Sequence, residues 1–266
     1  MSTQKRLFLV DAYALIFRGY YAFIKNPRIN SKGLDTSAIM GFMNSLLDVI
    51  KREKPDHLAV CFDKGGSAER TELYEAYKAN RDATPEAIKI AVPYIEEILR
   101  AMHIPIMVKE GFEADDVIGT LARQASAAGR HTLISTGDKD MAQLVDEHVT
   151  LINTMTNTLL DPPAVLEKFG IGPELIIDYL ALMGDKVDNI PGLPGVGEKT
   201  AAALLQGLGS IEQIYQQLDQ VAALSFRGAK TMAAKLQEFE AQLKLSYELA
   251  TIKCDVALPC TLDELQ

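Results

Sequence analysis

The chain has 266 residues, of which 48% are hydrophobic and 24% charged, and its mean hydropathy is +0.03. This composition excludes a wholly disordered chain, because enough apolar surface is present to offset the entropy lost on folding. No run approaches the roughly 18 apolar residues of a membrane span, which argues against a membrane protein. The three cysteines form no Cys-x-x-Cys pair and no cluster with the four histidines, so we expect neither a disulfide scaffold nor a zinc site.

The net charge of −9 is distributed unevenly along the chain. Residues 1–109 contain 16 Lys and Arg against 13 Asp and Glu, whereas residues 110–266 contain 11 against 23. A basic half beside an acidic half suits a phosphate-binding surface next to a metal-binding one, although chance explains the asymmetry equally well. The apolar stretch after Lys5 and Arg6 is interrupted by Asp11 and is followed by no small-residue cleavage site, so we expect a cytoplasmic protein.

The first 160 residues alternate between short apolar runs and helical patterns. The expected strands cover residues 6–11, 57–63, 104–109, 131–136 and 149–154, and a turn leads into 158–161. The expected helices between them cover residues 36–53, 84–102 and 114–127. Strands separated by helices of this length predict an α/β fold, in which a mostly parallel central sheet is flanked by helices.

The rest of the chain follows other patterns. Residues 64–83 are charged, contain two adjacent glycines and match neither template, which is typical of a functional loop or a mobile helix. From residue 162 onward only helices are expected, at 162–169, 173–183, 198–207, 210–220 and 228–250, interrupted at 184–197 by two prolines and four glycines. We therefore expect an α/β domain over residues 1–170 and a helical lobe over residues 171–266.

Carboxylates follow each of the first four expected strands. They are Asp11, Asp63, Glu113, Asp115, Asp116, Asp138 and Asp140. In an open parallel sheet the carboxyl ends of the strands meet at one edge, where ligands bind. Taken singly, Asp115 and Asp116 suit the first turn of any helix, and Asp138 suits a turn or a helix cap. Seven acids at one edge would repel one another unless cations neutralised them, and a donor set of oxygens alone favours Mg²⁺ or Mn²⁺.

Two further acids, Asp185 and Asp188, end a helix of the second lobe. If that lobe folds back over the sheet edge, they bring the number of acids to nine. Without these nine, 27 acids remain against 27 bases, so the acidic excess equals the size of the predicted metal site. A carboxylate site of this size typically holds two metals about 3.5–4 Å apart, one activating water and the other stabilising the leaving oxygen of a phosphate ester.

Two segments are candidates for binding nucleic acid. In the first, Lys78 and Arg81 would share a face if residues 74–81 were helical, with Tyr77 beside them and Arg70 shortly before. These bases would stabilise charge on a phosphate and the aromatic would stack on an unpaired base; the alternative is a solvated charged helix.

The second segment is glycine-rich and contains Gly192, Gly195, Gly197 and Lys199. It is not a P-loop, because Glu198 separates the glycine from the lysine and no strand precedes it. It is similar to the hairpin of helix-hairpin-helix elements, in which backbone N–H groups and a helix N-terminus hold a duplex phosphate. The alternative is an ordinary turn between helices.

Six blocks of sequence carry a resemblance that covers essentially the whole chain. They are LFLVDAYALIFRGYYAF, YKANRD, GFEADDVIGTLA, TGDKD, MGDKVDNIPGLPGVGEKTAA and ELATIKCDVAL. Together they resemble the 5′-nuclease (flap endonuclease) family, and within it the branch that forms the N-terminal domain of bacterial DNA polymerase I. Relatives often carry an aromatic residue ahead of Arg70, where this chain has glycines, serine, alanine and Glu69, so the details of the contacts there are open.

The resemblance implies a helical arch, over about residues 64–100, above the active site and a helix–three-turn–helix element in the lobe. It implies that the nine acids bind two Mg²⁺ ions, with Mn²⁺ as a substitute, and that Lys78 and Arg81 are catalytic bases of the arch with Tyr77 beside them. It places Arg18 against the substrate, and Gly192, Gly195 and Gly197 against the duplex and a K⁺ ion.

The function implied is that of a Mg²⁺-dependent, structure-specific 5′ nuclease that removes RNA primers, 5′ flaps and damaged 5′ ends in DNA replication and repair. The expected partner is branched or nicked duplex DNA, with no membrane involved. We expect a monomer in the cytoplasm, associated with the nucleoid. The resemblance favours a chain continuous with a polymerase domain, and the alternative is a stand-alone paralogue. Two alternatives are a non-catalytic module that binds branched DNA, and a hydrolase of RNA or a small phosphate ester. The hairpin argues against the second, because a small substrate needs no duplex clamp.

Overall fold

A six-stranded sheet in the order β3-β2-β1-β4-β5-β6 is the centre of the computed structural model, which describes residues 5–266. The strands are β1 (Arg6–Asp11), β2 (His57–Cys61), β3 (Ile106–Met107), β4 (His131–Ser135), β5 (Val149–Asn153) and β6 (Thr158–Leu160). All neighbouring pairs are parallel except β5 and β6, which are antiparallel. The order of the strands reverses next to β1, so the chain has the topological switch point at which α/β sheets bind ligands. The predicted mostly parallel α/β fold is confirmed.

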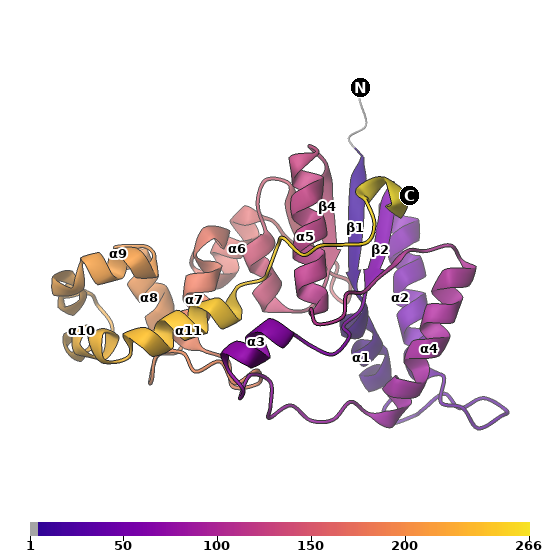
Figure 1. The fold of residues 1–266 in the computed structure, drawn as a ribbon, viewed down its shortest axis with the longest axis horizontal. Coiled ribbons are helices and arrows are strands. Elements are labelled where there is room, and N and C mark those ends of the chain that lie inside the picture. Colours follow the sequence, from indigo (N-terminus) through magenta and orange to yellow (C-terminus); the bar gives the residue numbers. More distant parts are fainter. Residues whose placement is uncertain (1–4) are drawn as a thin grey trace.

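Side chains alternate across the sheet and bury a different set of helices on each face. Phe8 and Val10 of β1 pack with α1 (Ala12–Ala22), α2 (Ser37–Glu53) and α4 (Glu86–Ala101). Leu7 and Leu9 point the other way and pack with α5 (Ala114–Ala127), as the layers of Figure 1 show. Helix α1 is absent from the expectations, because it follows β1 without a linker and the two form one continuous apolar stretch.

The expected arch is only partly helical. Helix α3 (Ala68–Leu73) ends where Tyr74 adopts an extended conformation, residues 75–80 form turns, and an extended segment leads to α4. Lys78 has a left-handed backbone with φ of 55°, which a continuous helix does not allow. The condition under which Lys78 and Arg81 would share a helix face, a helix over residues 74–81, is therefore not met. In Figure 1 this arch segment (residues 74–85) nevertheless crosses below the carboxyl ends of the strands.

The helical lobe begins after β6. Its elements are α6 (Pro162–Phe169), the 3₁₀ helix η2 (Pro173–Leu175), α7 (Ile176–Met183), α8 (Glu198–Leu208), α9 (Ile211–Gln216), η3 (Leu218–Ala223), α10 (Ala229–Glu238) and α11 (Glu240–Ala250). The single helix expected over 228–250 is thus two helices, which meet at Phe239. A further 3₁₀ helix, η1 (Lys139–Leu144), follows β4 and was not expected.

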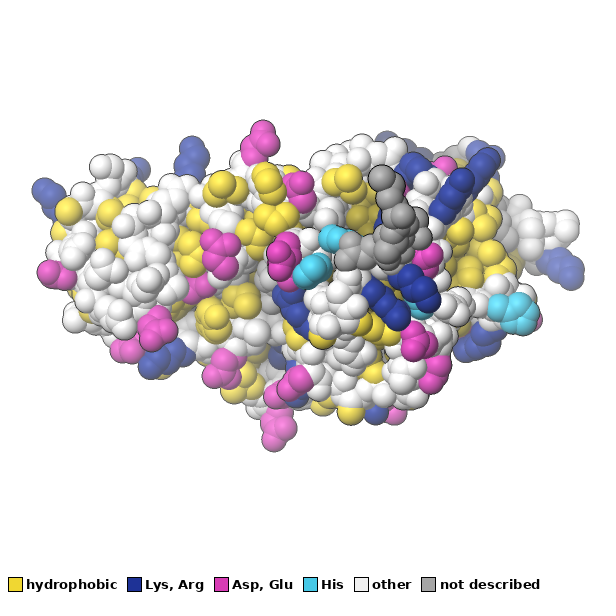
Figure 2. Space-filling model, turned by 90° about the horizontal axis from the view of Figure 1, so that it is seen from above, with side chains coloured by type: hydrophobic (Ala, Val, Ile, Leu, Met, Phe, Trp, Pro, Cys, Tyr) yellow, Lys and Arg dark blue, Asp and Glu magenta, His cyan; other side chains and the backbone are white. Residues whose placement is uncertain are grey.

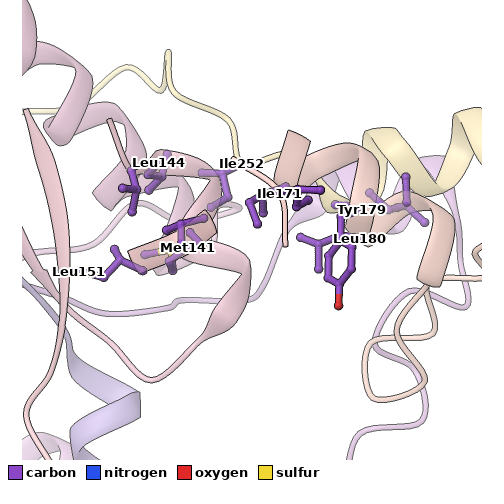
Figure 3. Close-up of a cluster of buried hydrophobic side chains, with 14 of the residues drawn as sticks. Met141, Leu144, Leu151, Ile171, Tyr179, Leu180 and Ile252 are labelled. Atoms are coloured by element: carbon purple, nitrogen blue, oxygen red, sulfur yellow. The ribbon is translucent and has the colours of Figure 1, made fainter. Parts of the chain in front are cut away.

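The lobe and the sheet share one hydrophobic core. Figure 3 shows side chains from both in contact around Met141, Leu144, Leu151, Ile171, Tyr179, Leu180 and Ile252. The chain then returns from α11 across α5 to the sheet as an extended segment, residues 251–261, and ends in η4 (Leu262–Leu265) beside β2 (Figure 1). We call residues 251–261 the C-terminal strap.

Within the described part of the chain, residues 5–266, every helix is too short or too polar to cross a bilayer. The face at the amino ends of the strands, seen from above in Figure 2, carries acidic and basic side chains side by side.

Candidate active site

Four carboxylates meet at the carboxyl edge of the sheet. They are Asp11, Asp63, Asp115 and Asp138. Burial raises the pKa of Asp11 to about 7, and the charges of Asp63 and Asp138 contribute to that rise. Burial also raises the pKa of Asp115, with further contributions from Asp138 and Asp11. Mutual repulsion of this kind requires the carboxylates to lie close together, as the strand ends predicted.

A second group of acids comes from η1 and the lobe. Asp140, Asp185 and Asp188 each present a carboxylate oxygen, and these oxygens all lie within 4.8 Å of one another. Asp185 is fixed by its own turn, because its Oδ1 accepts a hydrogen bond from the Val187 N–H at 2.8 Å. The lobe therefore folds back over the sheet edge, which is the condition on which Asp185 and Asp188 were included among the site acids.

Asp140 is the member of this second group whose chemistry most clearly suits a cation. Its Oδ1 is buried and has no hydrogen-bond partner among the described residues. Burial and the charges of Asp138 and Asp185 raise its pKa to about 7. Because Asp138 also raises the pKa of Asp11, it lies between the two groups. An unpartnered buried carboxylate oxygen among other oxygens is the donor environment of Mg²⁺, Mn²⁺ or Ca²⁺.

Glu113 precedes α5 and connects the acids to the arch segment. Its carboxylate accepts hydrogen bonds from Arg70 Nη1 at 2.6 Å and from the Tyr77 hydroxyl at 2.9 Å, and it forms an ion pair with Lys78. Nearby, Asp63 Oδ1 accepts a hydrogen bond from the Ala114 N–H at 2.5 Å, which ties the loop after β2 to the first turn of α5.

Lys78 and Arg81 both reach the acids although they do not share a helix. The Lys78 N–H donates to the Asp188 carbonyl at 2.8 Å, and Arg81 Nε donates to Asp188 Oδ1 at 2.7 Å. The two bases thus connect Glu113, two residues before Asp115 of the first group, with Asp188 of the second group. Lys78 also lines a small cavity together with Asp115, Asp140 and Asp188.

Tyr77 is not placed for the role that the sequence indicated. It is only 8% exposed, and burial raises the pKa of its hydroxyl, which donates to Glu113. Its ring is therefore not free to stack on a base. Arg70, also expected to bind DNA, is 9% exposed and pairs with Glu113 and Asp116.

Thr136 is a site residue that the sequence reasoning missed. Its hydroxyl donates to Asp11 Oδ2 at 3.2 Å and accepts a hydrogen bond from the Asp138 N–H at 3.0 Å. It thereby links the ends of the two strands, β1 and β4, that flank the switch point. The sequence signal that could have identified Thr136 is its position directly after β4, two residues before Asp138.

Arg18 on α1 lies beside this edge. Its Nη1 donates to Thr154 Oγ1 at 2.7 Å, and its side chain lines a pocket together with Tyr21, Thr136 and Met155. Because Thr136 also contacts Asp11, this pocket adjoins the first group of acids.

The glycines of the lobe hairpin fall into two kinds. Gly192 is structural: its N–H donates to Ser246 Oγ at 2.9 Å, and its carbonyl accepts from Gln242. A Cβ at Gly192 would lie 2.6 Å from the backbone nitrogen of Gly184, so only glycine fits this close approach. The prediction that Gly192 presents its backbone to DNA is therefore not supported by its position.

Gly195, Gly197 and Lys199, in contrast, are exposed at the start of α8. Gly197 is the N-cap residue of that helix, and no heavy atom lies within 4 Å of the position of a Cβ there. An exposed helix N-terminus with a lysine in its first turn is suited to binding a phosphate.

Comparison with known proteins gives a consistent result. The model of the "5′-3′ exonuclease, N-terminal resolvase-like domain" matches residues 6–170, and that of the "5′-3′ exonuclease, C-terminal SAM fold" matches residues 171–266. DNA polymerase I of Pseudomonas aeruginosa is 52% identical over 99% of this chain and 29% of its own length. A 5′-3′ exonuclease of Aquifex aeolicus is 38% identical over 99% of this chain and 87% of its own length. The chain thus spans about 30% of the length of several polymerase relatives that it matches.

Solved structures share the fold. The T5 5′-exonuclease with bound zinc has a TM-score of 0.75 and 22% identity, covering 94% of this chain and 90% of its own. The catalytic core of Rad2 in complex with a DNA substrate has a TM-score of 0.59 and 18% identity, covering 97% of this chain and 82% of its own.

Proposed function

Because the chain belongs to the 5′-3′ exonuclease family, we propose that it is a divalent-metal-dependent, structure-specific 5′ nuclease that hydrolyses DNA phosphodiesters as a 5′→3′ exonuclease and flap endonuclease. The observation that carries this proposal is the meeting of two groups of acids, one from the strand ends and one from η1 and the lobe, below the arch segment. The two bases of the arch segment contact acids there: Lys78 pairs with Glu113 at the start of α5, and Arg81 pairs with Asp188 of the second group.

We propose that the acids hold two Mg²⁺ ions, with Mn²⁺ as a substitute. Asp11, Asp63, Asp115 and Asp138 would hold one, and Asp140, Asp185 and Asp188 the other, with Asp138 between them. Cations bound there would lower the pKa of a coordinated water and neutralise charge on the scissile phosphate. The raised pKa values of Asp11 and Asp140 support this assignment, because burial and neighbouring carboxylates together disfavour the charged form of each side chain, and a bound cation would favour it.

The chain's own residues would position the phosphate. Lys78 and Arg81 lie against Glu113 and Asp188, where their charges would stabilise the negative charge that develops on the phosphate oxygens. Thr136 keeps Asp11 in register with the loop of Asp138. Attack of water on phosphorus with departure of the 3′ oxygen, which takes up a proton, would leave the phosphate on the 5′ end of the product.

We propose that the duplex lies along the lobe, with a backbone phosphate at the exposed N-terminus of α8 near Gly195, Gly197 and Lys199. Arg18 would contact the strand next to the scissile bond, because its pocket adjoins Asp11 through Thr136. The expected K⁺ ion at this hairpin stays a prediction, since no described contact bears on it.

The polymerase relatives give this activity a cellular setting. We propose that the protein removes RNA primers, 5′ flaps and damaged 5′ ends during replication and repair in the cytoplasm. We further propose that it acts as a monomer and that a polymerase domain continues its polypeptide. Residues 1–170 and 171–266 would then be the nuclease domain and the duplex-binding lobe, in contact through their common core.

The first test uses a 5′-labelled flap duplex, with single-stranded and blunt duplexes as controls, in excess over protein. We expect repeated turnover near the flap junction in Mg²⁺, no cleavage in EDTA, and a loss of at least about 100-fold in Asp138→Asn, because this variant removes a carboxylate shared by both groups. Tight binding of the flap without cleavage in Mg²⁺ or Mn²⁺ would instead identify a non-catalytic module that binds branched DNA.

A further inference from the structure

Arg70 and Asp116 form a buried ion pair behind the acidic edge. Arg70 Nη2 donates to Asp116 Oδ1 at 2.7 Å and Arg70 Nη1 donates to Asp116 Oδ2 at 2.9 Å, so the contact is bidentate. Asp116 is 1% exposed. The pair therefore lies inside the protein, at the start of α5.

Every acceptor position of Asp116 is occupied. Besides the two bonds from Arg70, Oδ1 accepts the Lys253 N–H at 2.9 Å and Oδ2 accepts the Glu113 N–H at 3.2 Å. A carboxylate has about four lone-pair sites, and four donors fill them. Asp116 differs in this from Asp140, which has an unpartnered buried oxygen.

The guanidinium of Arg70 connects two parts of the molecule that are distant in sequence. Nη1 also donates to Glu113 at 2.6 Å, and Nη2 also donates to the Thr251 carbonyl at 2.7 Å. One planar group thus fixes both a site carboxylate and the first residue of the C-terminal strap.

The strap is bound to the protein through side chains. Gln143 donates to the Ala250 carbonyl and accepts the Ile252 N–H, each at 2.8 Å. The Val256 N–H donates to Thr120 Oγ1 at 3.1 Å. Bonds of this kind fix a strap only while the side chains on α3, α5 and η1 keep their positions. The strap and the start of α5 therefore hold each other in place.

We propose that Arg70 and Asp116 are a positioning pair that couples the docking of the C-terminal strap to the placement of Glu113, and that neither residue contacts DNA or metal. The proposal rests on the nuclease function proposed above. Because Lys78 of the arch segment also pairs with Glu113, docking of the strap bears on the arch as well as on the acids.

Three variants separate this role from direct participation. Arg70→Lys keeps the charge but loses the bidentate geometry, and Arg70→Gln loses the charge. Gln143→Ala loosens the strap at a residue whose side-chain hydrogen bonds go to Ala250 and Ile252 and not to the acids. Lys253→Ala is the matched control: it removes the partly exposed ion pair with Glu69, which contributes little to docking, and keeps the backbone N–H that Asp116 accepts.

Three measurements are made on each folded variant: hydrogen exchange of residues 251–256, single-turnover flap cleavage against Mg²⁺ concentration, and flap affinity in EDTA over a salt series. For Arg70→Lys and Gln143→Ala we expect faster exchange in the strap and a higher Mg²⁺ requirement. Removing an outer partner of a metal site typically costs roughly 10–100-fold in metal affinity or activity. Flap affinity and its salt dependence should equal those of the wild type in all variants, including Arg70→Gln.

Two results would overturn the proposal. A phosphate contact by Arg70 would lower the slope of log affinity against log salt by about 1 in Arg70→Gln. A Gln143→Ala protein with faster strap exchange and an unchanged Mg²⁺ requirement would show that the strap and Glu113 are not coupled. Gln143→Ala therefore tests the coupling of the strap to Glu113 even if Arg70→Gln does not fold.

The role of Asp116 is tested by counting bound Mn²⁺ by electron paramagnetic resonance. Asp116→Asn should bind as many ions at saturation as the wild type, and a smaller number would identify Asp116 as a ligand. If the wild type itself cleaves no flap, the proposed nuclease function fails, whereas hydrogen exchange still tests whether Arg70 and Gln143 fix the strap.

Discussion

Asp140 and Asp116 have the same side chain and opposite surroundings. A buried oxygen of Asp140 has no hydrogen-bond partner among the described residues, whereas four donors surround Asp116. An unpartnered buried carboxylate oxygen is costly and is relieved by a cation, but a fully hydrogen-bonded carboxylate is already compensated. Burial alone therefore does not identify a ligand; the identity of the donors around the carboxylate does.

The acids at the site should make the metal-free protein less stable as the pH rises. The pKa values of Asp11 and Asp140 are raised from 3.8 to about 7 in the folded protein, so it binds more protons than the unfolded chain between these values. The free energy of unfolding then falls as the pH rises through this window, and the loss is complete above about pH 7.

Thermal unfolding in EDTA at about pH 5 and about pH 8 measures this loss, and Asp11→Asn is the reference because it removes one of the titrating groups. We expect a smaller change in Tm between the two pH values in Asp11→Asn than in the wild type. Added Mg²⁺ should raise Tm mainly at the higher pH, where the ligands are deprotonated. If the Tm of metal-free Asp11→Asn changed between the two pH values as much as that of the wild type, the assignment of the raised pKa to Asp11 would be contradicted.

The sequence predicted the strand-end acids because their positions depend only on strand direction. It did not distinguish Asp116 from the others, because the donors to Asp116 come from Arg70 and from the backbone at Lys253, which are far away along the chain. The same limit explains the exposed roles expected for Arg70 and Tyr77. Their burial depends on how α3 and the arch segment pack against α5.

Helix α1 connects the site to the packing of the sheet. It begins directly after Asp11 and carries Arg18, and it packs closely on α2 where Gly19 faces Gly41. The position of a Cβ on Gly41 lies 2.5 Å from the Cα of Gly19, so the two helix backbones touch. A shift of α1 would move both Asp11 and the pocket of Arg18.

Gly41→Ala should therefore reduce stability and cleavage together. The added methyl meets backbone, which cannot rotate away, so we expect a loss of about 1–3 kcal/mol in the free energy of unfolding. Gly137→Ala is the control for stability, because no heavy atom lies within 4 Å of its Cβ position and its φ is not in the left-handed region. Denaturant unfolding measures the stability of the two variants, and flap cleavage measures their activity. A Gly41→Ala protein as stable as the Gly137→Ala protein would show that α1 and α2 separate easily.

Elements were predicted where a turn or a change of periodicity separates them. The helices α2, α4 and α5 were expected within a few residues of their observed ends. Helix α1 was missed because no turn separates it from β1. Residues 74–81, which matched no template, form no helix because Lys78 takes a left-handed conformation, which its sequence does not signal.

At the scale of the whole molecule, the sheet and the lobe share one hydrophobic core. Their shared core explains how Asp185 and Asp188, which lie beyond the expected domain boundary, reach the acids of the strand ends. The α/β pattern and the helical lobe were readable from periodicity. The sequence could not predict that the lobe folds back over the sheet edge, because this depends on contacts between residues that are distant along the chain.

This shared core predicts a single cooperative unfolding transition. Leu180 of α7 is 4% exposed and lies in the cluster that joins the lobe to the sheet (Figure 3). We expect Leu180→Ala to lower the free energy of unfolding by about 2–5 kcal/mol, through lost burial and a residual cavity. The loss should appear equally in the hydrogen exchange of β4 and β5, because these strands belong to the same core. Leu166→Ala in α6 is the matched control: its side chain is exposed, so we expect a change within about 0.5 kcal/mol.

Calorimetry and circular dichroism of the Leu180→Ala protein decide between one unit and two. If the lobe were independently stable, the variant would lose the helices of the lobe in a first transition while the sheet kept its full protection. The acids of η1 would then separate from Asp185 and Asp188 before the protein unfolds, and metal binding would no longer stabilise both parts. A single transition in which Mg²⁺ protects sheet and lobe alike requires the core and the acidic edge to join them.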